Sequence, residues 1–87
     1  MPNSTIFRRI ELTEDYRPLS AERLVGTVEI SSPPHNPGLV FFKGDTGDDV
    51  EVIAGETHLF KNVDVSRIFA RGEPGSVLTI IGGTWRE

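Results

Sequence analysis

Short apolar runs separated by glycine and proline dominate the pattern of this chain. Within residues 23–31, every second position from Leu24 to Ile30 is apolar or glycine, and the positions between them include Thr27 and Glu29. A period of two with one polar face is typical of a half-buried antiparallel strand. This segment is therefore predicted to be a strand of an antiparallel sheet.

Similar runs recur along the chain. β-Branched and aromatic residues, which suit a pleated surface, fill the runs, and turn-forming residues separate them. Several short strands at a spacing of roughly 8–12 residues indicate a sandwich or a barrel. The predicted fold class is all-β, a small antiparallel β-sandwich or jelly-roll-like barrel of about seven strands. The predicted strands cover residues 5–12, 23–31, 39–42, 50–53, 57–60, 67–71 and 77–81.

The connections are predicted to be tight turns and loops. The segment 31–38 contains three prolines, and it is predicted to be a rigid loop because proline cannot donate the hydrogen bonds of a central strand. Residues 62–66 are predicted to form a corner in which Asp64 and Ser66 bond to the local backbone. Residues 13–22 are polar, and a short helical turn is expected at 20–23.

The chain has 87 residues, enough for one domain. Residues 1–22 are interpreted as an N-terminal segment, either the first strand of the sandwich, which is preferred, or an arm that orders on a partner. Residues 23–87 are predicted to form the sandwich. The chain has no cysteine, which excludes disulfides and thiolate zinc sites. A small domain without these supports is expected to gain stability from partner contacts.

The charge of the chain argues against direct binding of nucleic acid. Nine Lys and Arg against 13 Asp and Glu give a formal net charge of −4. A general nucleic-acid binder needs a basic surface to displace counterions from phosphates. No apolar run approaches the roughly 20 residues of a membrane helix, and the N-terminus lacks a signal-peptide pattern. Neither a nucleic acid nor a membrane is therefore predicted as a partner.

No catalytic motif stands out. His35 and His58 do not have the spacing of a zinc helix motif or of the histidine pair in cupin-like barrels. The serines lie in turns, without a nucleophile elbow. The chain is therefore predicted not to be an enzyme and to use no cofactor or metal. The acidic turn 45–49 is a candidate cation site, and the alternative is a hairpin turn stabilised by aspartate hydrogen bonds to the local backbone.

Several turn and strand motifs follow one another in a recognisable order. They are Asn36-Pro37-Gly38, Val40-Phe41-Phe42-Lys43-Gly44, Ile53-Ala54-Gly55-Glu56-Thr57, the segment 63–70, and the segment 75–83. Their order resembles that of small β-sandwich virion proteins of tailed bacteriophages. The resemblance covers residues 24–83, and Ala54 stands where the related turn usually has proline.

The resemblance implies a structural virion protein, such as a capsid decoration or cement protein or another head- or tail-associated component. Such a protein would bind the major capsid protein or other virion subunits, self-associate, and reside in the virion after assembly in the host cytoplasm. The alternative is a carbohydrate- or ligand-binding β-sandwich in which Tyr16 and Trp85 act as stacking platforms. An enzyme with paired carboxylates is a third class.

A set of partner-interface residues is predicted from exposure and residue type. Trp and Arg are enriched among interface hot spots. Trp85 is interpreted either as a cap over the edge of the core or as an anchor for a partner. The Arg8-Arg9 doublet is interpreted either as an exposed strand face or as a contact with an acidic neighbouring subunit. The predicted interface residues are Ile6, Phe7, Arg8, Arg9, Tyr16, Trp85 and Arg86.

Overall fold

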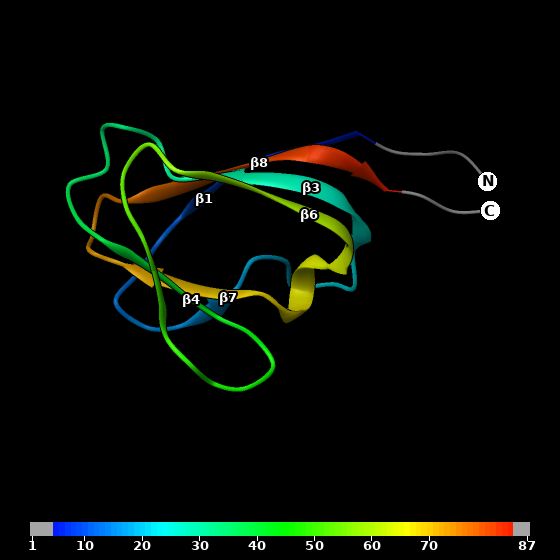
Figure 1. Ribbon diagram of the computed structural model, residues 1–87, viewed down its shortest axis with the longest axis horizontal. Coiled ribbons are helices and arrows are strands. Elements are labelled where there is room, and N and C mark those ends of the chain that lie inside the picture. The colour runs from blue at the N-terminus through cyan, green and yellow to red at the C-terminus, as the bar shows by residue number, and fades with distance from the viewer. Residues whose placement is uncertain (1–4, 85–87) are drawn as a thin grey trace.

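The computed structural model describes residues 5–84, which form two antiparallel four-stranded sheets packed face to face (Figure 1). Sheet A has the strand order β1-β8-β3-β6, and sheet B has the order β2-β7-β4-β5. The strands are β1 (Thr5–Glu11), β2 (Arg17–Pro18), β3 (Val25–Ser31), β4 (Val40–Lys43), β5 (Val50–Val52), β6 (Thr57–Asp64), β7 (Phe69–Gly72) and β8 (Val77–Thr84). One turn of 3-10 helix, η1 (Val65–Arg67), follows β6.

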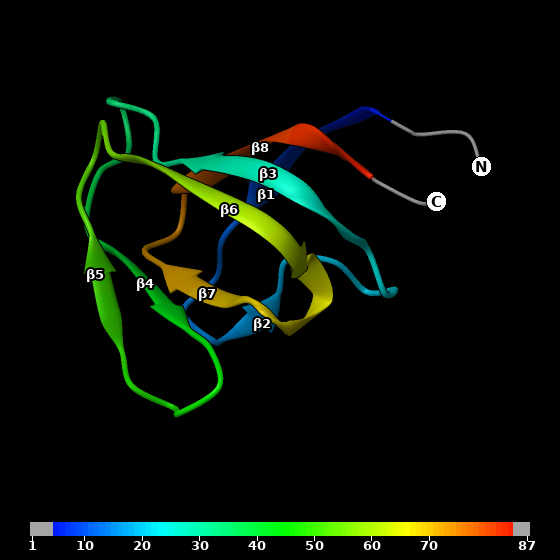
Figure 2. The same ribbon diagram turned by 45° about the vertical axis from the view of Figure 1, so that its right-hand side comes forward.

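The strand pairing is that of one long hairpin rolled into a sandwich. Along this hairpin β1 pairs with β8, β2 with β7, β3 with β6, and β4 with β5. Rolling the hairpin brings β3 beside β8 and β4 beside β7, and these pairs complete the two sheets (Figure 2). Eight strands in this double-sheet arrangement form a jelly roll. The predicted all-β fold class is confirmed.

The sequence predicted about seven strands, and the additional one is β2, which lies in the polar segment 13–22 and was not predicted. β2 has only two residues, and it is defined by its pairing with β7 rather than by an alternating pattern. The expected helical turn at 20–23 is wrong, since these residues form a bend. The Ser20 hydroxyl donates to the backbone carbonyl of Glu22 at 2.7 Å, a local bond that competes with helix formation.

The first strand, β1, is the edge strand of sheet A. All seven of its residues are in register with β8, from Thr5 opposite Gly83 to Glu11 opposite Val77. Residues 5–11 therefore form the first strand of the sandwich, which is the preferred of the two interpretations of the N-terminal segment. Because β1 joins sheet A and β2 joins sheet B, this segment is built into both layers of the sandwich.

The core lies between the sheets and follows the predicted alternation. In β3, Gly26, Val28 and Ile30 point inward and are buried. A Cβ atom at Gly82, on the paired strand β8, would lie 2.2 Å from the backbone oxygen of Thr27, so β3 and β8 can approach each other only because this residue is glycine. The buried apolar side chains that form the core are Ile6, Leu12, Leu19, Val28, Ile30, Val40, Val52, Val65, Ala70, Leu78 and Ile80.

The predicted corner at 62–66 is only partly right, because residues 62–64 still belong to β6 and the turn itself is η1, which Asp64 caps. The Asp64 carboxylate accepts hydrogen bonds from the Ser66 amide at 3.0 Å, the Ser66 hydroxyl at 2.7 Å and the Leu24 amide at 3.1 Å. The Ser66 bond first, and then the Leu24 amide, hold the pKa of Asp64 below its ordinary value. This one carboxylate therefore ties the corner to the start of β3.

Candidate functional site

The outer face of sheet A carries an apolar row that crosses all four strands. Strand register aligns Phe7 on β1, Ile81 on β8, Glu29 on β3 and Leu59 on β6. Phe7 is 71% exposed, Leu59 54% and Ile81 51%. We call these four residues the apolar row. The solvent face of an antiparallel sheet is usually polar, so this row is a candidate contact surface.

A second row, next to the first, is polar. Register aligns Arg9 on β1, Thr79 on β8, Ser31 on β3 and Thr57 on β6. The hydroxyls of Ser31 and Thr57 share a hydrogen bond of 2.9 Å. We call these four residues the polar row. The two rows together place an apolar strip beside a strip of hydrogen-bonding groups on the same surface.

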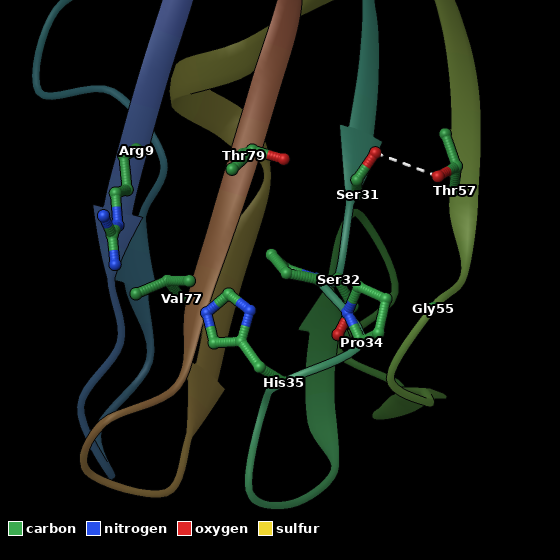
Figure 3. A pocket seen from close by; sticks show the side chains of 10 residues that line it. Arg9, Ser31, Ser32, Pro34, His35, Gly55, Thr57, Val77 and Thr79 are labelled. Carbon is green, nitrogen blue, oxygen red and sulfur yellow. Dashed lines mark hydrogen bonds between the residues drawn. The ribbon is translucent and has the colours of Figure 1, made fainter.

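A pocket of about 490 Å³ lies where the proline-rich loop meets the polar row (Figure 3). Arg9 on β1 and His35 on the loop lie on either side of Val77, as Figure 3 shows. Among residues 5–84, no acidic side chain lines the pocket. We call it the Arg9 pocket, and its lining residues are Arg9, Ser31, Ser32, Pro33, Pro34, His35, Gly55, Thr57, Val77 and Thr79.

The loop of the Arg9 pocket is held in place by a buried amide side chain. Asn36 is 8% exposed, and its amide group donates to the Ser32 hydroxyl and to the Val77 carbonyl, both at 2.8 Å. Its side-chain oxygen accepts from the Val77 amide at 2.9 Å. Asn36 thus pairs with the start of β8 much as a strand residue would. These bonds give the adjacent His35 a defined position.

The outer face of sheet B carries a compact cluster of aromatic and charged side chains. The Lys43 ammonium lies 4.3 Å from the ring centroid of Tyr16, and the Arg71 guanidinium lies 5.4 Å from it. Arg71 also lies 4.4 Å from the Phe41 ring. The Tyr16 hydroxyl donates to Asp49. We call these five residues the Tyr16 cluster. Lys43 and Arg71 therefore both lie against the Tyr16 ring, and its role as a stacking platform stays a prediction.

The Tyr16 hydroxyl titrates in an altered environment. Desolvation raises the pKa of Tyr16, and the hydrogen bond to Asp49 raises it further. The Asp49 carboxylate also lies 4.0 Å from the Lys43 ammonium. In the rest of the acidic turn 45–49, the Thr46 hydroxyl donates to Asp48 at 3.0 Å. Two of the turn's carboxylates are thus engaged within the chain, and the cation site there stays a prediction.

An apolar cleft of about 350 Å³ opens between β6 and the β4–β5 hairpin. Phe42 and Phe60 line it, and a hydrogen bond of 2.8 Å between His58 and Glu56 lies at its rim. The bond from His58 first, and then the bond from the Ile53 amide, hold the pKa of Glu56 below its ordinary value. These rim groups are engaged with each other, whereas Arg9 in the other pocket has no such partner within residues 5–84.

The structure separates the predicted interface residues. Phe7 and Arg9 lie together on the outer face of sheet A, whereas Ile6 is a core residue with 4% exposure. Arg8 points to the inner side of β1 and reaches the Ser20 hydroxyl at 3.5 Å. Tyr16 lies on sheet B. Trp85 and Arg86 are outside the described residues.

Sequence reasoning missed Leu59 and Ile81 as surface residues. A signal was present, because adjacent side chains in a strand point to opposite faces. The doublets Ile6-Phe7, Leu59-Phe60 and Ile80-Ile81 must each place one large apolar residue outward. The polar row had no such signal, since the register that aligns its members comes from long-range pairing.

Side chains able to hold a metal are not grouped in residues 5–84: no set of three or more His, Asp or Glu there could bind an ion. Nor does this part of the chain contain a helix long and apolar enough to cross a membrane. Comparison with known protein families, with curated proteins and with solved structures found no match to the chain. Jelly rolls include viral capsid domains, lectins and cupins, so the fold alone does not select a function.

Proposed function

We propose that this protein is a structural assembly module that docks on a larger protein through the outer face of sheet A. The apolar row carries this proposal. Three of the six exposed large hydrophobic residues in the described chain lie on it: Phe7 and Ile81 on adjacent strands, and Leu59 beyond Glu29. Apolar side chains gathered on one solvent-exposed face mark interaction sites, whereas scattered ones need no explanation.

The acidic member of the apolar row defines the chemistry of the partner. Glu29 lies between Ile81 and Leu59 across the strands, and it has no ion pair within residues 5–84. A docked surface would remove this carboxylate from water, which is costly without a cationic partner. The partner surface is therefore apolar, with a Lys or Arg placed to meet Glu29.

The particular assembly we propose is the virion of a tailed bacteriophage, where the chain decorates or cements the capsid. The motif order over residues 24–83 supports this step, and the jelly-roll fold is compatible with it. Without a capsid, the purified protein is expected to form a homo-oligomer through the same face of sheet A.

The first experiment measures assembly directly. Size-exclusion chromatography with light scattering reports self-association, and co-sedimentation with expanded capsids reports lattice binding. The capsids are assembled from the major capsid protein encoded nearest to this chain's gene. A strict monomer that does not bind capsids would contradict the proposed function. A genome neighbourhood without capsid or portal genes would contradict the virion assignment only.

Surface variants locate the interface. Ile81→Thr and Leu59→Thr keep strand-compatible shapes and remove apolar surface from the row. Each is expected to weaken association by about tenfold, the scale of a hot-spot contact, with the fold intact. Ile53→Thr is the matched control, because Ile53 is 55% exposed and lies outside the apolar row. Equal loss of binding in the control would show that the apolar row is not the interface.

A further inference from the structure

We propose that the Arg9 pocket is an oxyanion-binding site, which takes a carboxylate, sulfate or phosphate group between Arg9, His35 and the Thr79 hydroxyl. The proposal rests on the pocket itself and stands whether or not the apolar row docks a protein. Each set of donors contributes separately.

Arg9 is the main anion ligand. Within residues 5–84 its guanidinium forms no ion pair, whereas Arg71 and Lys43 are held against aromatic rings. The nearest acid on the same face of β1 is Glu11, two residues away, which forms no ion pair within this part of the chain. A free guanidinium presents a planar fork of donors that matches the oxygens of a carboxylate or phosphate.

The hydroxyls of the polar row supply neutral donors. Ser31 and Thr57 share one hydrogen bond, and either oxygen can be the donor. Whichever of the two donates, the hydroxyl hydrogen of the other remains available to a ligand. Thr79 lies beside Ser31 in the same row (Figure 3). Of these hydroxyls, that of Thr79 lies on the strand next to Arg9, and those of Ser31 and Thr57 lie two and three strands away, along the pocket wall.

The loop side of the pocket is organised before a ligand arrives. Asn36 holds the loop to β8, and the Ser32 amide donates to the Glu56 carbonyl at 2.8 Å. His35, between these anchors, faces the same hollow as Arg9 and adds a second group that can donate to an anion. A preorganised loop lowers the entropy cost of binding.

The charge of the lining gives the pocket its selectivity. The chain as a whole carries a formal net charge of −4, yet Arg9 and His35 line this pocket without an acid. A cationic hollow on an acidic protein attracts anions only at short range, and added salt screens the attraction. Binding is therefore expected to be weak, saturable and salt-dependent.

The test is an NMR titration of the 15N-labelled full chain with sodium sulfate, sodium phosphate or sodium acetate. Ionic strength is held constant with sodium chloride. Saturable shifts are expected at the backbone amides of the Arg9 pocket, including Ser32, Thr57 and Thr79. Tighter binding of acetate identifies a protein carboxylate as the source of the group, and tighter binding of sulfate or phosphate identifies a free inorganic anion.

Variants separate a built site from general screening. Arg9→Gln is expected to weaken binding by about tenfold, the scale of a charge-assisted hydrogen bond. Arg17→Gln is the matched control: Arg17 is an exposed arginine on sheet B, and its loss is expected to leave affinity within about twofold. Shifts that do not saturate, or that are equal in both variants, would overturn the proposal. A similar response to neutral glucose would overturn it too.

Leu59→Thr distinguishes this proposal from the proposed function. The variant leaves the Arg9 pocket untouched, so it is expected to lose protein association while it keeps sulfate, phosphate or acetate binding. Loss of both properties in a folded Leu59→Thr protein would contradict the independence of the two sites.

Discussion

The two outer faces of this jelly roll treat their large side chains in opposite ways. On sheet B, the Tyr16 ring is covered by Lys43 and Arg71, and its hydroxyl is bonded to Asp49. On sheet A, Phe7 is 71% exposed and Arg9 has no ion-pair partner within residues 5–84. The Tyr16 cluster on sheet B satisfies its own aromatic and charged groups, whereas Phe7 and Arg9 on sheet A are left open.

The difference separates groups that stabilise the fold from groups that are available to a partner. Interactions closed within sheet B are gained on folding, so their loss lowers the free energy of unfolding. The exposed side chains on sheet A contribute little to the free energy of unfolding. They contribute to the free energy of binding when a partner covers them. Three changes, taken from the largest expected effect to the smallest, test this division.

Both faces rest on one core, so removal of a central core side chain should weaken them together. Leu78, on β8, is fully buried at 0% exposure. Leu78→Ala is expected to lower the free energy of unfolding by about 2–5 kcal/mol because it leaves a cavity. That is a large share of the roughly 5–15 kcal/mol that stabilises a typical domain. Chemical denaturation followed by tryptophan fluorescence or circular dichroism measures the effect.

Ile81→Ala on the same strand is the matched control for the core. Its side chain points away from the core and is 51% exposed. We expect a loss of at most about 1 kcal/mol, mainly from strand propensity. If the two variants lost equal stability, the apolar row would belong to the folding core rather than to an open surface.

The second change compares aromatic residues on the two faces. Tyr16→Leu removes the ring beneath two cations and the hydroxyl bonded to Asp49, and a loss of about 1–2 kcal/mol is expected. Phe7→Leu is the same kind of change on sheet A, where a surface substitution is expected to stay within about 0.5 kcal/mol. Urea denaturation of both variants measures the difference. A larger loss for Phe7→Leu would reverse the assigned roles of the two faces.

The third change uses pH to weaken the sheet B face alone. Desolvation and the Asp49 bond raise the pKa of Tyr16, so folding favours the neutral phenol. This contribution is fully present below the ordinary tyrosine pKa of about 10 and is lost as pH rises through the higher folded value. Tyr16 is the only tyrosine in the chain, so phenolate absorbance reports it alone.

Tyr16→Phe is the control for the alkaline titration. The variant keeps the lysines, so the difference in stability between the two proteins at pH 9 and pH 11 isolates the phenol. We expect the wild-type protein to lose more stability than Tyr16→Phe over this window. A phenolate transition at or below the ordinary tyrosine value would contradict the closed arrangement around Tyr16.

Much of the fold was readable in the sequence because it depends on local chemistry. Alternation in residues 23–31 predicted β3 and its buried face. The Asp64 and Ser66 side chains predicted the corner at η1, since their hydrogen bonds span only two residues. β2 was not readable, because a strand of two residues carries no period and is defined by its partner, β7.

The candidate site was readable only in part. Phe7 and Arg9 were in the predicted interface set, but nothing local places Thr79 beside Ser31, or Leu59 in the same row as Ile81. The interface set also contained Ile6, which the structure buries. A doublet such as Ile6-Phe7 shows that one member faces outward, and only the packing of the second sheet decides which.

The sequence by itself determined that this protein is an antiparallel all-β domain, because side-chain period, turn residues and local capping act over a few positions. The tertiary structure decided how a single hairpin rolls into two sheets and thereby which residues share a row. It also decided that Tyr16 contacts Lys43, Arg71 and Asp49, while Arg9 has no ion pair within residues 5–84. Those outcomes depend on strand register between distant segments, and a shift of one residue in register would turn every outward side chain inward.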